Sequence, residues 1–295
     1  MIIINYILYY LVIIPISLLP FWVLYRISDL LFLLQYYAIR YRKDVVLTNI
    51  KNSFPNKSNK EHKAIQRKFF RHFCDLVVES FKLFTISEEE IAKRVVLVNP
   101  APIKELQKNK QSFLIALGHY NNWEMLAVAA TKLVKHQPLV IYKPLTNKFF
   151  DDKMQLTRGK FGIKLIPMKS VGDYLEKKST KPTMTCFVTD QSPSSPQKAY
   201  WLNFLNQETG VMYGIEKYGK KYNLPILYGS LQKVKRGYYT IEVSTITEDP
   251  SSTAYGAITT LATQALEKDI IAKPEYWLWT HKRWKHNKPT DTVVN

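Results

Sequence analysis

The chain has 295 residues and a net charge of +18, from 42 Lys and Arg against 24 Asp and Glu. With 46% hydrophobic and 22% charged residues, it has enough apolar side chains for a sizeable core, which excludes global disorder. A mean hydropathy of −0.19 excludes a protein that crosses a membrane many times. With only two cysteines, Cys74 and Cys186, the chain cannot form a disulfide-stapled scaffold. It contains no cluster of Cys and His residues that would predict a metal site.

The first 25 residues contain no charged side chain, and only Asn5, Ser17 and two prolines interrupt their apolar run. A bilayer core needs about 20 apolar residues in a helix, so the run is long enough to span it. It has no basic n-region and no small-residue cleavage site, so we expect a retained membrane anchor over residues 1–38. Pro15 and Pro20 are expected to kink a helix, which leaves a helix lying in the membrane interface as the open alternative.

Basic residues begin directly after this run. Because positive flanks stay cytoplasmic, the remaining domain, residues 39–295, is predicted to face the cytoplasm. Residues 40–72 hold ten basic side chains against two acidic ones, which fits either an anionic lipid surface or a solvated helix face. Nucleic acid is not expected as a partner, because no nucleic-acid-binding motif is present. The basic residues nearest the run are Arg26, Arg40, Arg42 and Lys43.

The chain after residue 40 alternates between helical and strand patterns. Such alternation predicts an α/β domain with a mainly parallel central sheet flanked by helices. In these sheets, functional residues gather where strands end and helices begin. The expected strands are 95–98, 113–117, 139–142, 164–166, 185–189, 226–230 and 239–243, and the expected helices are 44–53, 60–84, 101–109, 121–135, 149–160, 170–178, 210–222 and 251–270.

His119 stands in the most informative stretch, GHYNNWE, where an apolar strand runs into a helix. Glu124 follows five residues later in the first helical turn, and a loop histidine can fold back onto a carboxylate there. Such a carboxylate would fix the imidazole tautomer and leave the other ring nitrogen as a general base. From spacing alone a second interpretation stays open, namely a helix-capping histidine beside a glutamate that the helix dipole favours.

The same stretch resembles a known family. His119-x4-Glu124 is similar to the HX4(D/E) motif of glycerolipid acyltransferases, and the flanking Gly and Asn-Trp-Glu look like the late acyltransferases of lipid A biosynthesis. Further blocks resemble that family in the same order along nearly the whole chain. They are YRKDVVLTNIKNSFP at 41–55, YKP at 142–144 followed by Arg158 and Gly162, TDQSP at 189–193, and EYWLWTHKRWK at 275–285.

This resemblance implies transfer of a fatty acyl chain from acyl carrier protein to a hydroxyl of a lipid A precursor, at the cytoplasmic face of the inner membrane. It implies no cofactor, and the absence of Gly-rich phosphate motifs gives nucleotide binding no support. The sequence departs from the family pattern at Lys143, where Arg is usual, and near Asn206, where Gly is usual. These departures concern the acceptor pocket more than the chemistry. Two alternatives stay open: acylation of another membrane lipid, and a non-catalytic protein that binds membranes through its basic face.

The resemblance also implies roles for individual residues. His119 is expected to take the proton from the acceptor hydroxyl and Glu124 to orient His119. Arg158 is expected to stabilise the oxyanion, to bind an acceptor phosphate or to remain a surface charge. Asp190 is expected to position Arg158 or an acceptor hydroxyl, or else to form a turn. The other expected substrate-binding residues are Lys143, Gln191, Asn122 and Trp123, whereas Trp279, His281, Arg283 and Trp284 are expected mainly to cover the core.

Overall fold

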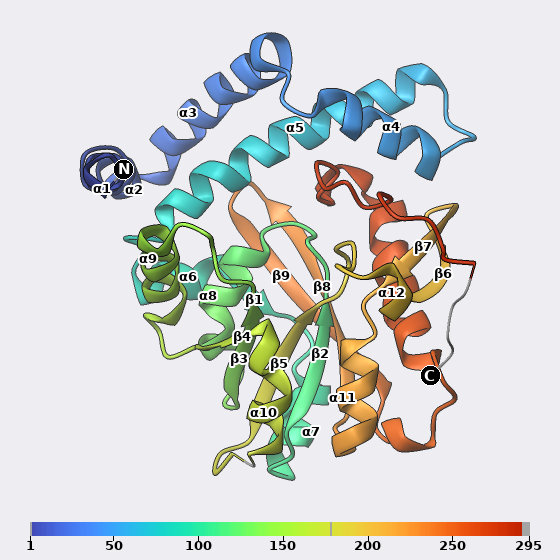
Figure 1. The fold of residues 1–295 in the computed structure, drawn as a ribbon. Helices are drawn as coiled ribbons and strands as arrows, with labels where there is room; N and C mark the ends of the chain where they lie inside the picture. Colours follow the sequence, from blue (N-terminus) through green and yellow to red (C-terminus); the bar gives the residue numbers. More distant parts are fainter. Residues whose placement is uncertain (1, 178, 291–295) are drawn as a thin grey trace.

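The computed structural model describes residues 2–177 and 179–290. Residue 1 of the predicted anchor, residue 178 of a predicted helix and residues 291–295 of the predicted second domain lie outside it. A seven-stranded sheet with the order β1-β9-β8-β2-β5-β3-β4 forms its centre, and helices cover both faces (Figure 1). Every neighbouring pair in this sheet runs parallel except β8 and β9. The strands are β1 (Val95–Leu97), β2 (Phe113–Leu117), β3 (Gln137–Tyr142), β4 (Lys164–Pro167), β5 (Thr183–Val188), β8 (Ile226–Lys235) and β9 (Tyr238–Thr247).

The helices after residue 40 follow the predicted order. Those expected at 44–53, 60–84, 101–109, 121–135 and 149–160 are confirmed to within about two residues at each end. Ser58 begins the longest of them with a capping box to Glu61. The helices are α4 (Lys43–Ser53), α5 (Asn59–Lys82), α6 (Glu88–Arg94), α7 (Ala101–Lys108), α8 (Trp123–Leu133), α9 (Lys148–Gly159), α10 (Val171–Glu176), α11 (Gly214–Tyr222) and α12 (Ala257–Ala272).

Residues of β2 alternate between the two faces of the sheet. Phe113, Ile115 and Leu117 pack into a core with α6, α7 and α8, whereas Leu114 and Ala116 pack into a second core with α11 and α12. All five side chains are buried, because β2 lies between β5 and β8 and helices cover it on both sides. The α/β architecture predicted from the sequence is therefore confirmed.

The region between β5 and α11 differs from the prediction. Residues 200–211 form an antiparallel hairpin of β6 (Tyr200–Phe204) and β7 (Gln207–Val211), so the helix predicted over 210–222 begins only at residue 214. Leu205 and Asn206 make the turn with φ of +51° and +61°. The polar side chains of this two-stranded hairpin interrupt the apolar alternation that marks a strand, which explains why the pattern misled.

The N-terminal segment is a bent pair of helical arms instead of one anchor helix. The first arm runs over Ile3–Leu18 and the second over Phe21–Ile39, with a bend of 117° between them. Pro20 lies at the bend and donates no backbone hydrogen bond, so the first arm stops there. Within the described residues no helix is by itself long and apolar enough to cross a membrane, although the bent pair meets that test as a unit. The arms comprise α1 (Ile2–Ile7), η1 (Leu8–Ile13) and α2 (Ile14–Leu18), then α3 (Phe21–Leu33) and η2 (Leu34–Ile39).

Candidate active site

The loop between β2 and α8 carries His119 to the edge of the sheet where its parallel strands end. Gly118 packs against Leu266 of α12, and a Cβ atom at this position would come within 2.5 Å of the Leu266 side chain. Asn121 turns the chain with a φ of +55°, and its Nδ2 donates to the Leu231 carbonyl at 2.7 Å. The loop is therefore fixed on both sides of His119, which gives the imidazole a defined direction.

The carboxylate that contacts the His119 imidazole is Asp190. His119 Nδ1 lies 2.6 Å from Asp190 Oδ1, and the backbone N–H of His119 donates to Asp190 Oδ2 at 2.9 Å. The expectation that Glu124 orients His119 is wrong in this structure. Asp190 follows β5, and β2 and β5 are parallel neighbours, so their carboxyl ends bring the two residues together across 71 positions of sequence.

Asp190 is buried and accepts a third hydrogen bond, from Trp277 Nε1 at 2.7 Å. Burial of the carboxyl raises its pKa, but the facing His119 imidazole and the hydrogen bonds outweigh burial and lower the pKa of Asp190 to about 2. The carboxylate is thus ionised at neutral pH and holds His119 with its proton on Nδ1. The other ring nitrogen, Nε2, then carries the lone pair and accepts from the Gln191 amide at 3.1 Å.

Glu124 forms a bidentate ion pair with Arg158 of α9. Arg158 Nε donates to Glu124 Oε2 at 2.8 Å, and Arg158 Nη2 donates to Glu124 Oε1 at 2.5 Å. The two side chains are only 21% and 18% exposed, so the pair is shielded from most of the solvent. Arg158 is therefore not a free surface charge, which removes one of the three roles expected for it.

A cavity of about 310 Å³ lies between α8 and the sheet. It is lined by α8 residues from Trp123 to Leu133, a length of roughly 16 Å at 1.5 Å per residue. Polar groups that line it include His119, Glu124, Arg158 and Gln191, whereas most of the lining is apolar. The apolar lining residues of the sheet and α8 include Leu97, Ile115, Leu117, Leu126, Ala127, Ala130, Val134, Val140, Met184, Cys186, Val188, Ile241 and Val243.

The other expected substrate-binding residues fall into two groups. Lys143, Trp123 and Gln191 line the cavity, and the Trp123 ring lies edge-on to the imidazole of His119 with centroids 4.9 Å apart. Asn122 is buried and is not among the described residues that line the cavity. It serves instead as the N-cap of α8, a structural role that corrects the expectation of substrate contact.

The side chain of Asn122 also leads to a buried carboxylate that sequence reasoning missed. Asn122 Nδ2 donates to Glu79 of α5 at 2.6 Å, and Tyr25 and Tyr239 donate to the same carboxyl at 2.9 and 2.8 Å. Burial raises the pKa of Glu79, although the hydrogen bonds from Tyr239 and Asn122 lower it. Glu79 thereby joins α3, α5, α8 and β9 behind the site. A single glutamate within an amphipathic helix gives no sequence signal for such a role.

The C-terminal segment covers the back of the site. His281 Nε2 accepts from the backbone N–H of Ser192 at 3.0 Å, and burial lowers the pKa of His281 to about 4. Trp279 and Arg283 are buried, which is the covering role expected for them. Trp277 was missed as a site residue, although it lies in the tryptophan-rich block that suggested the family.

An ionised carboxylate thus holds an imidazole beside a long apolar cavity, at the edge where parallel strands end. This constellation is typical of an α/β enzyme whose substrate carries an extended apolar chain. The chain belongs to the bacterial lipid A biosynthesis acyltransferase family, whose sequence model matches residues 2–286. The protein is accordingly an acyltransferase, and its family acts in lipid A biosynthesis. No curated protein sequence matches the chain.

Proposed function

We propose that the protein transfers a fatty acyl chain from an acyl carrier protein thioester to a hydroxyl of a lipid A precursor, at the cytoplasmic face of the inner membrane. Residues 1–38 would serve as the membrane anchor and residues 39–295 as the catalytic domain. The single observation that carries this proposal is the His119–Asp190 pair beside the apolar cavity under α8. Membership of the family supports both the reaction class and the acceptor class.

The cavity suits the hydrocarbon chain of the donor. An acyl chain that enters along α8 exchanges water for aliphatic side chains, and each buried methylene contributes about 0.8 kcal/mol to binding. The thioester then lies at the polar lining, within reach of His119 and the Glu124–Arg158 pair. Trp123 and Lys143, which line the same cavity, are the proposed contacts to the substrates.

His119 is the proposed general base. Its Nε2 takes the proton of the acceptor hydroxyl as that oxygen bonds to the thioester carbonyl carbon, and the imidazolium is stabilised by Asp190. The tetrahedral intermediate then expels the carrier's thiolate, and the imidazolium returns its proton to that sulfur. The products are the acylated lipid and the free carrier thiol, and His119 is restored. General-base assistance of this kind contributes about 10²–10⁴-fold to rate.

Gln191 occupies the position that the acceptor hydroxyl must take. Its Nε2 lies 3.1 Å from His119 Nε2, so the amide shields the lone pair of the base in the absence of substrate. On binding, the acceptor hydroxyl replaces the amide as the donor to Nε2. The displaced amide remains beside the reacting centre, where it is the proposed hydrogen-bond partner of the acceptor.

Arg158 is the proposed stabiliser of the oxyanion. Its Nε and Nη2 are engaged by Glu124, whereas Nη1 makes no hydrogen bond to a residue that the structure describes. Glu124 therefore acts on Arg158, which it holds in one orientation and partly neutralises. A positioned guanidinium stabilises the charge that develops on the carbonyl oxygen without reorganising during the reaction.

Direct transfer is favoured over an acyl-enzyme intermediate on cysteine. Cys186 lines the cavity, but burial raises the pKa of its thiol to about 12. A thiol with this pKa is protonated at neutral pH and is a poor nucleophile. The acceptor hydroxyl is therefore the proposed attacking group.

The test uses the purified full chain with acyl carrier protein loaded with a fatty acid and a lipid A precursor. We expect the mass of the precursor to rise by one acyl group with wild type, and His119→Ala to lose this activity. Gln111→Ala, away from the cavity, serves as the matched control and should retain full activity. Full transfer by His119→Ala would overturn the proposed mechanism. Transfer only to another membrane lipid supplied in parallel would overturn the proposed acceptor.

A further inference from the structure

We infer that both N-terminal arms bind the surface of a lipid bilayer from one side, lying along the interface of a single leaflet instead of crossing the membrane. The inference rests on how the arms pack against the catalytic domain, and it does not depend on the identity of the donor or acceptor.

The first arm packs along its length against α5 and α9. Near its start the Asn5 side chain lies 3.4 Å from the Asn147 side chain, and the Tyr6 ring lies 4.8 Å from the ring of Phe149. Lys153 of α9 donates to the Tyr10 hydroxyl at 3.1 Å. From residue 5 to residue 19 the arm covers roughly 21 Å at 1.5 Å per residue.

At the bend the first arm is bonded to the end of α5. Lys82 Nζ donates to the carbonyls of Ser17 and Leu19 at 3.0 and 2.9 Å, and Thr85 Oγ1 donates to the Ser17 carbonyl at 2.6 Å. Ser17 is fully buried. These bonds satisfy the carbonyls that the helix leaves free where it ends before Pro20.

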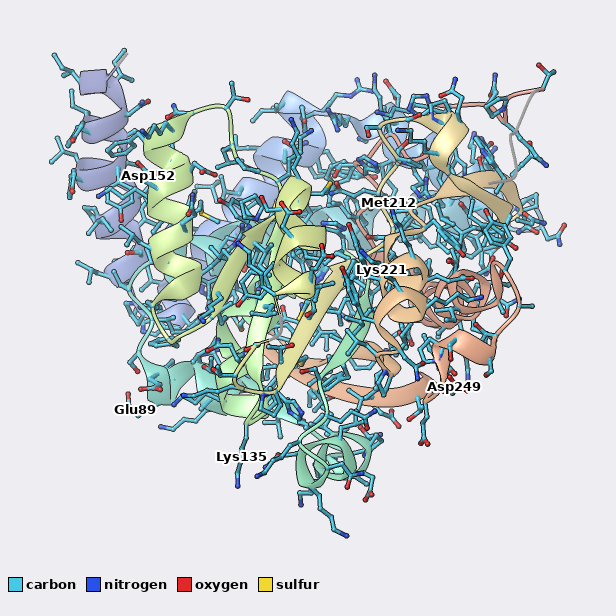
Figure 2. All side chains as sticks on the ribbon, turned by 60° about the horizontal axis from the view of Figure 1, so that its bottom comes forward. Glu89, Lys135, Asp152, Met212, Lys221 and Asp249 are labelled. Atoms are coloured by element: carbon cyan, nitrogen blue, oxygen red, sulfur yellow. The ribbon has the colours of Figure 1, made fainter. Side chains whose placement is uncertain are left out.

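A helix that crosses a bilayer is surrounded by lipid over about 30 Å, so its neighbours share its environment. Lys153 of α9 contacts Tyr10 of the first arm, and Figure 2 shows Asp152 on α9 next to the N-terminal helix. A charged side chain at the bilayer centre lowers partitioning into the membrane by on the order of 100-fold per residue. A first arm that spanned would therefore have to leave all of these contacts.

The second arm is held against α5 by buried polar bonds. Ser28 Oγ donates to Asp75 at 2.7 Å and the Tyr25 hydroxyl donates to Glu79 at 2.9 Å. Arg236, from the loop between β8 and β9, donates to Asp29 at 2.8 Å. Removing this arm from α5 would leave carboxylates without these partners, so the arm is held firmly against the catalytic domain.

The opposite faces of both arms are apolar and uncovered. Among the side chains whose exposure the structure describes, 16 of the 25 exposed large hydrophobic ones lie within residues 3–41. Such a concentration is typical of a membrane or protein contact surface, not of a surface that faces water. On the first arm they include Ile3, Ile4, Ile7, Leu8, Leu11, Val12 and Leu18, and on the second Trp22, Leu30, Leu33, Leu34, Tyr37 and Ile39.

The shape and charge of this surface favour a lipid bilayer as the partner. Two segments that meet at a bend define one plane, so both arms can lie in a single membrane interface. In Figure 1, α3 crosses the top of the molecule and the first arm is seen end-on beside it. Exposed Arg26, Arg40 and Arg42 accompany the apolar rows. Apolar rows with flanking Arg or Lys are the features of helices that lie in the interface of anionic membranes.

This placement also brings the cavity to the membrane. Phe149 and Lys153 of α9 contact the first arm, whereas Asp151, Met154 and Arg158 on the same helix line the cavity. α9 thus separates the membrane-bound first arm from the cavity by the width of one helix, about 10 Å. A lipid substrate then reaches the site from the leaflet that holds the arms.

The first experiment measures the depth of the arms. Spin labels are attached to cysteines introduced at Ile4, Leu11 and Leu18 and the full chain is bound to vesicles of mixed phosphatidylcholine and phosphatidylglycerol. We expect all three labels at one shallow depth, about 5–10 Å below the headgroups. A label at the bilayer centre for Leu11, between shallow labels at the other two positions, would show a spanning arm and overturn the inference.

The second experiment tests the apolar rows. Leu11→Glu and Leu33→Glu, one on each arm, should each weaken vesicle binding by at least about tenfold, because a leucine is lost from the interface. Leu261→Glu on α12 is the matched control, since Leu261 is 49% exposed and Leu33 is 52% exposed, and it should bind like wild type. Binding unchanged by both arm variants, or a stable dimer that forms through the arms without vesicle binding, would overturn the inference.

Discussion

Asp190 and Glu124 are two carboxylates of one site with different partners. Asp190 faces an imidazole and an indole N–H, and Glu124 faces a guanidinium. The first pairing fixes the tautomer of His119, and the second fixes the orientation of Arg158. A change to either carboxylate should therefore affect a different part of the reaction.

Asp190→Asn is expected to lower kcat by about 10²–10⁴-fold. The amide nitrogen of asparagine donates to Nδ1 of His119, which places the ring proton on Nε2 and removes the base. The measurement is single-turnover acyl transfer at saturating substrate. Asp190→Glu should recover part of the rate if its carboxylate reaches Nδ1, and wild-type kcat in Asp190→Asn would contradict the role of the carboxylate.

The depressed pKa of Asp190 predicts a pH dependence of stability. Its folded-state pKa of about 2 lies below its ordinary value of 3.8, so the interaction stabilises the fold above about pH 4 and is lost as pH falls toward 2. This shift of almost two pKa units corresponds to roughly 2.5 kcal/mol. We expect the difference in free energy of unfolding between wild type and Asp190→Asn to shrink by about this amount over that window. A difference that is independent of pH would exclude an ionised, paired carboxylate.

Glu124 and Arg158 should behave as one unit. Glu124→Gln and Arg158→Gln are each expected to lower kcat/KM, and the double variant should cost little more than the worse single variant. The reason is that each change removes the same bidentate pair. A double-mutant cycle on kcat/KM, with thermal stability measured in parallel, gives the coupling. Additive losses would show that Glu124 and Arg158 act independently.

At the scale of elements, α8 is the helix that joins binding to chemistry. Its first turn carries Glu124 and begins four residues after His119, and its remaining length covers the apolar cavity. Asn122 fixes the start of α8 and donates a hydrogen bond to Glu79 on α5, so α5 holds α8 in place. The depth of the cavity and the position of the candidate base are thus set by the same element.

Ala127→Leu on α8 is expected to shorten the preferred acyl chain. Ala127 lines the cavity, and a larger side chain fills space that the end of a long chain would use. Each methylene that no longer fits loses about 0.8 kcal/mol, roughly fourfold in binding. Rates with a series of acyl carrier protein thioesters measure the optimum. Ala272→Leu, exposed at the end of α12, is the control and should leave the optimum unchanged.

At the scale of the whole molecule, a net charge of +18 accompanies an apolar surface on the two arms. Under the proposed function, the charge would attract anionic lipids, acceptor phosphates and an acidic carrier protein, and the apolar arms would retain the protein at the membrane. Attraction between separated charges weakens with salt, whereas apolar contact does not.

KM for the acyl carrier protein thioester is therefore expected to rise by about tenfold between low salt and 0.5 M salt, roughly the range over which the Debye length falls below 5 Å. KM for a short, uncharged acyl thioester should change little, because it has no acidic surface to attract. Steady-state kinetics with both donors at matched ionic strengths test this. Equal salt dependence of KM for the two donors would show that the salt effect does not come from attraction to the carrier protein.

Much of the fold was predictable because it rests on local patterns. Apolar runs of strand length between helical stretches predicted the α/β sheet, and the helical pattern of residues 60–84 predicted α5. The hairpin of β6 and β7 was not predictable from these patterns. Its strands alternate weakly in polarity, and their pairing and the cover they receive from Trp277 come from the rest of the chain.

The sequence by itself determined the family, the identity of the candidate base and the apolar, basic character of the N-terminus, because each of these depends only on residue types and short spacings. Only the tertiary structure decided that Asp190 pairs with His119, that Glu124 pairs with Arg158, and that the first arm packs sideways on α9. Partners 71 or 34 residues apart meet only when neighbouring strands and helices are placed in space. Spacing along the chain favours the nearest carboxylate, whereas the parallel ends of β2 and β5 select the one that is close in space.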